Sequence, residues 1–127
     1  MRLMHDSVCT ALMHASGTFQ NPYLDDASQP VRFWANKYKT KFNEDPTVFS
    51  AYGYNIIDAL AAAAGKAGNN LTTESFIKAM DTMKIAPDIF GSPIAKFGPN
   101  KRQASDLARL SQLQDARWKV VQDYIKP

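Results

Sequence analysis

One stretch decides the fold, DPTVFSAYGYNIIDALAAAAGKAG, which spans residues 45–68. Asp45 can accept a hydrogen bond from an unpaired amide of a first helical turn, and Pro46 lacks the amide that would go unpaired there. Gly65 and Gly68 mark the other end, because glycine adopts the left-handed conformation without a Cβ clash. We therefore expect a core helix of roughly five turns, packed on more than one side at its alanine-rich end. Its apolar stripe recurs at three- and four-residue spacing and consists of Val48/Phe49, Tyr52, Ile56, Leu60 and Ala63/Ala64.

The composition is that of an ordinary globular protein. The 127 residues are 45% hydrophobic and 21% charged, which argues against disorder and is enough for one domain with a real core. No apolar run reaches the roughly 20 residues needed to cross a bilayer, so membrane insertion is not expected. The N-terminal Met1-Arg2-Leu3-Met4 runs directly into His5 and Asp6 and has no apolar centre of the kind that a secretory signal requires.

The charge is mildly basic, with a net value of +3 and a pI of about 9.0. Lys37, Lys39 and Lys41 are its main concentration, and at helical spacing they spread around about half of the circumference. This spread favours a solvated helix face over a phosphate-binding patch. The neighbouring aromatics are expected to form the buried side of the same helix, so no nucleic-acid partner is predicted; they are Phe33, Trp34 and Tyr38.

Two elements are expected before the central helix. The run from Ser7 to Met13 mixes β-branched with small residues and predicts a buried strand, although its period also allows a helical turn. A helix follows from Gln29 or Pro30 to about Phe42, with Ser28 placed to cap it. Its apolar face is expected to hold Val31, Trp34, Tyr38 and Phe42.

A third helix is expected after the central one. It should run from Thr72 or Thr73 to about Met83, with Thr72 as its cap and Glu74 in the first turn, where the helix dipole favours an anion. A short strand is predicted at Ile94 to Phe97, among prolines and glycines that exclude a long helix. The buried face of the third helix is expected to hold Phe76, Ile77, Met80 and Met83.

The C-terminal tail allows two interpretations. Residues 107–114 suit a helix, because their leucines recur at helical spacing, but they also suit a strand. In the second interpretation the chain turns at Asp115-Ala116 and returns as a strand from Trp118 to Tyr124, where β propensity is high. The residue pattern alone leaves both open.

No catalytic, metal or cofactor site is expected. His5 and His14 belong to no cluster with ligand spacing, and Cys9 between them is more simply a small buried thiol than a nucleophile. Asp25 and Asp26 are not followed by the alternating oxygen ligands that a calcium loop needs. We therefore predict a protein that is not an enzyme.

A characteristic order of residues begins at Val31. It includes Tyr38-Lys39-x-Lys41-Phe42-x-Glu44-Asp45-Pro46, Ala51-Tyr52-Gly53-Tyr54, Gly91-Ser92-Pro93, Phe97-Gly98-Pro99-Asn100 and Ala108-Arg109-Leu110. In this order the chain resembles the C-terminal part of the type I periplasmic binding proteins. These are the branched-chain amino-acid (Leu/Ile/Val-type) substrate-binding proteins of ABC transporters.

The resemblance implies an α/β fold that is a part of the periplasmic-binding-protein-like I fold. Three main helices, a short N-terminal strand and a C-terminal β-hairpin are expected. Family members are much longer and consist of two lobes that close on a ligand like a hinged clamp. By this comparison, 1–127 is a single truncated domain in which 1–45 and 85–127 are similar to the second lobe. Residues 46–84 would be a helix pair similar to the first lobe.

The resemblance also implies a function. The chain would be the solute-binding component, in fragment form, of an ABC transporter for amino acids or similar small polar solutes. Its implied partners are an amino-acid-like ligand and, for full-length family members, the ABC permease. The implied location is periplasmic, or cytoplasmic if the chain is the whole product, since no signal peptide is recognised. In the family an aromatic residue near the start of the central helix faces the cleft, and Tyr54, with Tyr52 as second choice, has that position; core packing is the alternative for both.

A second function remains open. A small protein-interaction or regulatory domain derived from such a binding protein would need no ligand of its own. A concave pocket lined by Tyr54 would favour the first function, and an exposed apolar groove without such a pocket would favour the second. In either case a fragment leaves apolar helix faces uncovered, so we expect self-association.

Overall fold

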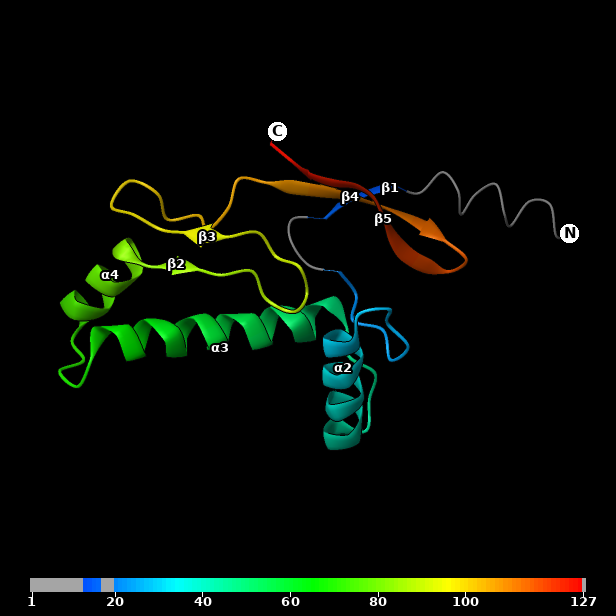
Figure 1. Ribbon diagram of the computed structural model, residues 1–127, viewed down its shortest axis with the longest axis horizontal. Helices are drawn as coiled ribbons and strands as arrows, with labels where there is room; N and C mark the ends of the chain where they lie inside the picture. The colour runs from blue at the N-terminus through cyan, green and yellow to red at the C-terminus, as the bar shows by residue number, and fades with distance from the viewer. Residues whose placement is uncertain (1–12, 17–19, 127) are drawn as a thin grey trace, which may run out of the picture.

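The computed structural model describes residues 13–16 and 20–126, and side chains from residue 20 onward. Three helices, a short N-terminal strand and a C-terminal hairpin make up an α/β fold, as the resemblance implied (Figure 1). Most of the strand expected at Ser7–Met13 lies outside the described residues, as do His5 and Cys9. The elements in order are β1 (Met13–Ser16), α2 (Gln29–Phe42), α3 (Val48–Ala67), α4 (Thr73–Thr82), β2 (Lys84–Ile85), β3 (Ala95–Lys96), β4 (Ala108–Gln114) and β5 (Arg117–Ile125).

The main sheet is antiparallel and has the order β1-β4-β5. The tail is therefore a β-hairpin, and the helical interpretation of residues 107–114 is wrong. Pairing on both sides explains the outcome, because β4 bonds to β1 through Met13↔Gln112 and to β5 through Leu113↔Trp118. The hairpin turns at Asp115 and Ala116, whose φ angles of 52° and 59° match a type I′ turn.

Each helix begins at a local cap. α4 is capped as expected, since Thr72 Oγ1 accepts from the Ser75 amide at 3.1 Å. α3 begins two residues later than predicted: Thr47 takes the N-cap position, and Asn21 Oδ1 accepts from the Val48 amide at 2.8 Å. Ser28 has the N-cap position of α2, but its side chain makes no capping bond. α2 ends at Asn43, which adopts the left-handed conformation.

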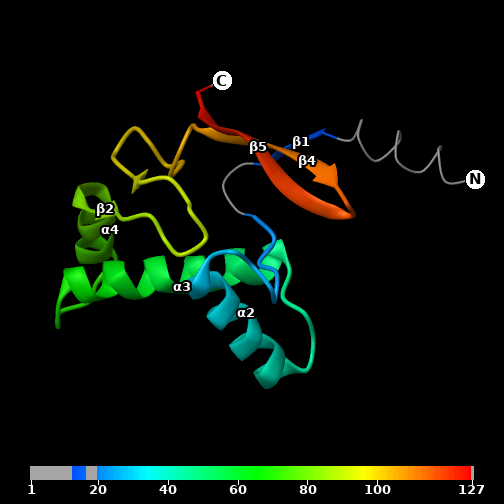
Figure 2. The same cartoon turned by 45° about the vertical axis from the view of Figure 1, so that its right-hand side comes forward.

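The helices meet mainly at their ends. α2 runs down from the N-terminal end of α3, and α4 packs against the opposite end (Figures 1 and 2). The short pair β2–β3 lies beside α4, and the three-stranded sheet lies on the other side of α3 from α2 (Figure 1). No described helix is long and apolar enough to span a membrane.

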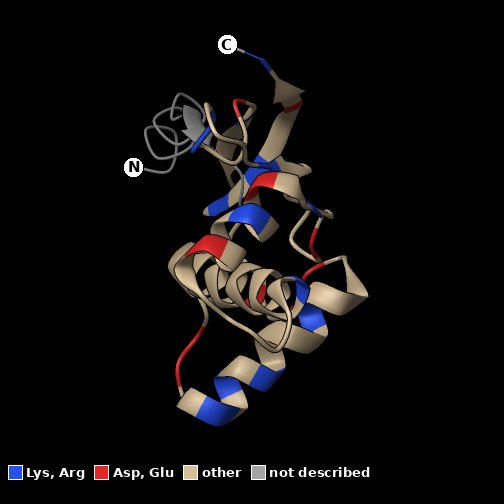
Figure 3. Cartoon of the chain, turned by 90° about the vertical axis from the view of Figure 1, so that its left-hand side faces the viewer, with Lys and Arg blue, Asp and Glu red and all other residues tan. Residues whose placement is uncertain are grey.

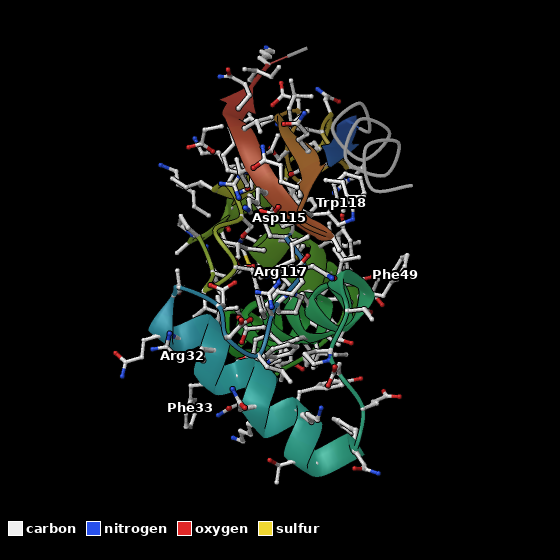
Figure 4. All side chains as sticks on the ribbon, turned by 90° about the vertical axis from the view of Figure 1, so that its right-hand side faces the viewer. Arg32, Phe33, Phe49, Asp115, Arg117 and Trp118 are labelled. Carbon is white, nitrogen blue, oxygen red and sulfur yellow. The ribbon has the colours of Figure 1, made fainter. Side chains whose placement is uncertain are left out.

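The expectation of a well-covered core helix is wrong. α3 is continuous, but three residues of its apolar stripe are exposed, Phe49 by 78%, Ile56 by 64% and Leu60 by 50%. In Figure 4 the ring of Phe49 projects away from the ribbon. Only the C-terminal half of α3 meets α4, and only one side of its N-terminal half meets α2 and the loop at residues 88–92, so nothing in the described chain covers this face.

Two other predicted apolar faces are also only partly covered. On α2, Val31 is buried and Trp34 and Tyr38 are half-buried, but Phe33 and Phe42 are mostly exposed, contrary to expectation. On α4 the expected face is half-buried except for Ile77, which is exposed. Val31 and Phe90 are the larger members of the buried core. Its other members are alanines, namely Ala35, Ala51, Ala63 and Ala79.

Candidate functional site: an aromatic groove between two helices

Three aromatic rings pack together where α2 approaches α3. Phe90 is buried, and its ring lies 5.0 Å from that of Trp34 at an interplanar angle of 87°. The ring of Tyr54 lies edge-on to both, at 5.6 Å from Trp34 and 6.1 Å from Phe90. Such edge-to-face pairs place the positive edge of one ring against the negative face of another and are each worth about 0.5–1.5 kcal/mol beyond burial. The cluster therefore fixes the position of Tyr54.

Above this cluster lies a groove of about 720 Å³. Its volume is within the range of roughly 300–1,000 Å³ that is typical of small-molecule sites. α2 supplies most of its wall, α3 supplies Ser50, Gly53 and Tyr54, and the loop after β2 supplies Ile89. The wall from α2 consists of Pro30, Phe33, Trp34, Lys37, Tyr38, Lys41 and Phe42.

The two tyrosines predicted as site residues lie in different surroundings. Tyr54 lines the groove, is 47% exposed, and its hydroxyl bonds to no described residue. Tyr52 is half-buried beside the core cluster of Val31, Ala51 and Phe90, and it is not among the residues that line the groove. The structure therefore brings Tyr54 to a cavity and Tyr52 to the packed side of α3.

A short loop at residues 88–92 places Phe90 in the cluster. The Asp88 carboxylate accepts from the amides of Phe90 at 2.9 Å and Ser92 at 3.1 Å, and it also accepts from the side-chain amide of Asn55 on α3. These bonds attach the loop to the helix. Sequence analysis missed Asp88 and Phe90, although an aspartate two residues before the amide that it binds is typical of a local turn.

The same loop is attached to the hairpin through Gly91. Its carbonyl accepts from the Tyr124 hydroxyl at 2.6 Å and from Arg109 at 3.3 Å. The Arg109 guanidinium stacks 4.1 Å from the Tyr124 ring and pairs with Asp123 at 3.0 Å. Burial raises the pKa of Tyr124, because it disfavours the phenolate. Gly91 has a φ of 74°, a conformation that favours glycine.

The remaining charged pairs lie at the surface. Asp25 pairs with Arg117 at 2.8 Å, and this hydrogen bond lowers the pKa of the aspartate. Asp26 accepts from the Ser28 amide at 2.8 Å instead of contributing to a cation site with its neighbour. Within residues 20–126 no three histidine, cysteine, aspartate or glutamate side chains gather as a metal site would require. The groove offers rings, hydroxyls and two ammonium groups for non-covalent binding.

A groove of this size, lined mainly by aromatic and apolar side chains with a few polar groups, is typical of small-molecule sites. A family model described as "Periplasmic binding protein" matches residues 5–117. The chain belongs to this family of ABC-transporter substrate-binding proteins, as the sequence resemblance predicted. At the level of the family these are solute-binding proteins and not enzymes.

Solved structures share the fold over about a third of their length. One is provisionally assigned as a branched-chain amino acid ABC transporter from Rhodospirillum rubrum and is 24% identical, with a TM-score of 0.63. The match covers 89% of this chain and 31% of that protein. A substrate-binding protein from Desulfitobacterium hafniense in complex with Leu is 20% identical, with a TM-score of 0.61. The match covers 91% of this chain and 32% of that protein. A solute-binding protein from R. palustris in complex with benzoate is 14% identical, with a TM-score of 0.58. The match covers 84% of this chain and 29% of that protein. No curated protein matches the chain.

Proposed function

We propose that the chain is the solute-binding component, in fragment form, of an ABC transporter for amino acids or similar small polar solutes. The observation that carries this proposal is the aromatic groove, because it is the size of a small-molecule site and holds a tyrosine hydroxyl that bonds to none of residues 20–126. The Leu and benzoate complexes of the solved relatives support it, since both ligands combine a carboxylate with an apolar body.

Tyr54 is the residue that we assign to ligand binding. Its ring is held by Trp34 and Phe90, so a ligand would meet a wall that is already ordered. Its hydroxyl can donate to a carboxylate or accept from an ammonium group. Tyr52 remains the second choice, with a role in packing against the core cluster beside the site.

Isothermal titration calorimetry of the purified chain with leucine and with benzoate tests this function. We expect saturable binding of at least one ligand, and loss of roughly tenfold in affinity in Tyr54→Ala, because both stacking area and a hydroxyl are removed. Phe49→Ala is the matched control, since it removes an exposed aromatic ring from the same helix outside the groove. Absence of binding to both ligands, or equal affinity of Tyr54→Ala and the native chain, would contradict the proposal.

The finer assignments follow the family. We propose a periplasmic site of action and an ABC permease as the partner of the full-length protein. We also propose that 1–45 and 85–127 correspond to the second lobe and 46–84 to the first. The loop at residues 88–92 supports this division, because it bonds to α3 on one side and to the hairpin on the other, as a connection between lobes would.

A second proposal concerns self-association. The exposed apolar residues of α3 form an uncharged stripe beside a second groove of about 390 Å³, which Ile56 and Leu60 line together with Phe76, Met80 and Phe97. Each large apolar side chain hides roughly 100 Å² when it is buried, so four to six of them supply a substantial part of the roughly 800 Å² that each partner of a stable interface contributes. We infer that a second copy of the chain covers this stripe.

Light scattering coupled to size-exclusion chromatography tests the association. We expect a mass above 14.1 kDa for the native chain, falling with dilution, and a monomer for Ile56→Lys combined with Leu60→Lys. Val121→Lys combined with Ile125→Lys places the same two charges on exposed residues of β5 and should leave the mass unchanged. A native monomer at all concentrations would refute the association and leave the solute-binding proposal standing.

A further inference from the structure

We propose that the aromatic groove selects a small monocarboxylate with a flat apolar body and no ammonium group, and that Lys37 and Lys41 hold the carboxylate. This inference rests on the proposed function, because it assumes that the groove is the solute site. It goes further by naming the ligand class and the residues that choose it. Among residues 20–126 the two lysines are the only charged residues that line the groove.

The structure divides the lysines of α2 into two kinds. Lys39 points away from the groove and pairs with Asp45 at 2.6 Å. Lys37 and Lys41 line the groove, and neither pairs with a carboxylate of residues 20–126. α2 itself contains no acidic residue, and its ribbon in Figure 3 carries basic segments without acidic ones. All three side chains are exposed, as the solvated-face interpretation predicted, but only Lys37 and Lys41 also line the groove.

The two groove lysines are also close to each other. Residues four apart on a helix lie on the same face, and like charges at this spacing repel. A carboxylate between the two ammonium groups would remove this repulsion and accept a hydrogen bond from each. Lys41 lies 5.5 Å from the centre of the Phe42 ring, so its ammonium group stays beside the aromatic wall.

The wall fits a flat apolar body. The rings of Trp34 and Tyr38 lie 5.5 Å apart on α2, and Tyr54 faces them from α3. Phe33 projects from α2 at the outer edge of the groove and is 71% exposed (Figure 4). These rings contact one another, so a flat apolar group would lie against their exposed surface and bury area on one of its faces there.

The groove lacks a carboxylate that could pair with an ammonium group, since among the described residues no aspartate or glutamate lines it. The nearest carboxylate that contacts the wall is Glu44, which accepts from the Tyr38 hydroxyl at 2.9 Å outside the groove. An α-ammonium group placed beside the carboxylate of a ligand would lie close to Lys37 and Lys41 and be repelled. The groove should therefore prefer a simple acid to the corresponding amino acid.

Calorimetry with two matched pairs of ligands tests the preference. Benzamide is the neutral counterpart of benzoate, and phenylalanine differs from 3-phenylpropionate only by its ammonium group. We expect benzoate to bind the native chain at least about tenfold more tightly than benzamide, 3-phenylpropionate to bind at least about tenfold more tightly than phenylalanine, and the affinity of both acids to fall as salt is raised. Equal or tighter binding of benzamide or phenylalanine than of its matched acid would overturn the inference.

Lysine variants identify the residues responsible. Lys37→Gln and Lys41→Gln should each weaken benzoate binding by roughly fivefold and leave benzamide unaffected, since each removes one partly exposed charge. Lys39→Gln is the matched control and should change neither. Unchanged benzoate affinity in both groove variants would refute the role of the lysines. If leucine binds with dependence on Tyr54 but charge has no effect, this inference fails while the proposed function stands; if no ligand binds, both fail.

Discussion

Two adjacent sides of α3 are apolar but have different surroundings. On one side Ala51 and Tyr52 pack with Val31 of α2 and with Phe90 of the loop at residues 88–92. On the other, Phe49, Ile56 and Leu60 are also apolar but stay exposed. Apolar side chains favour burial on whichever face they stand, but a face is buried only where another element reaches it. The difference shows that a few loop contacts, and not the apolar stripe, decide which side of α3 is core.

The largest expected effect comes from the centre of the covered face. Phe90→Ala should lower the free energy of unfolding by about 3–5 kcal/mol, because it removes the largest buried side chain and leaves a cavity. Ile57→Ala on the open face should cost less than about 0.5 kcal/mol in dilute solution. Urea denaturation of both variants measures the contrast. Similar losses in the two would mean that the faces do not differ in burial.

A smaller effect is expected at the attachment of the loop to α3. Asp88→Ala should cost about 2 kcal/mol, because the amides of Phe90 and Ser92 and the side chain of Asn55 lose a charged acceptor. Asp58→Ala is the control, since it removes an exposed aspartate from α3, the helix to which the loop is attached. Hydrogen exchange of the Phe90 amide should accelerate only in the first variant. Unchanged exchange would show that another contact holds the loop.

Gly91→Ala tests the backbone of the loop. It should cost about 1–2 kcal/mol, because an alanine at a φ of 74° brings its Cβ close to its own carbonyl oxygen. Crowding contributes little, as the added Cβ would meet Arg109 only at 3.6 Å or more. Gly65→Ala, in the last turn of α3 and in open space, should instead raise stability by about 0.5–1 kcal/mol. Thermal melting of both variants gives the sign of each change.

The smallest effect is expected where the loop meets the hairpin. Tyr124→Phe should cost about 1 kcal/mol, because one hydrogen bond to Gly91 is lost. The raised pKa of Tyr124 means that the folded chain holds this proton more tightly than the unfolded chain. Its contribution to stability is thus present below pH 10.0 and is lost as the pH rises through the folded pKa.

An alkaline stability series therefore gives a second measurement of the same contact. The native chain should lose stability more steeply than Tyr124→Phe above pH 10.0, and the tyrosinate absorbance should develop over a higher range in the native chain. Parallel stability curves for the two chains would place Tyr124 outside the buried contact.

Part of the candidate site could be predicted from sequence and part could not. Tyr54, which lines the groove, was singled out through the family resemblance, which depends on the order of residue types along the chain. Phe90 and Asp88 were missed, since they lie in an irregular loop and their partners outside that loop are 33 or more residues away along the chain. The different roles of Lys39 and Lys41 were also missed, because helical spacing gives their directions around α2 but not which direction faces α3.

The amino-acid sequence by itself determined the three helices, the strand signals of the tail and the family, since these depend on local propensity, periodicity and the order of residue types. The tertiary structure decided between the two interpretations that the residue pattern left open for the tail, with residues 108–114 as a strand, and it alone decided that one side of α3 is open and that four aromatic side chains of α2 form a groove with two lysines at its wall. The physical reason is that burial and pairing are properties of two elements together. A single stretch of chain fixes what it can bury, and only its neighbours in space fix what it does bury.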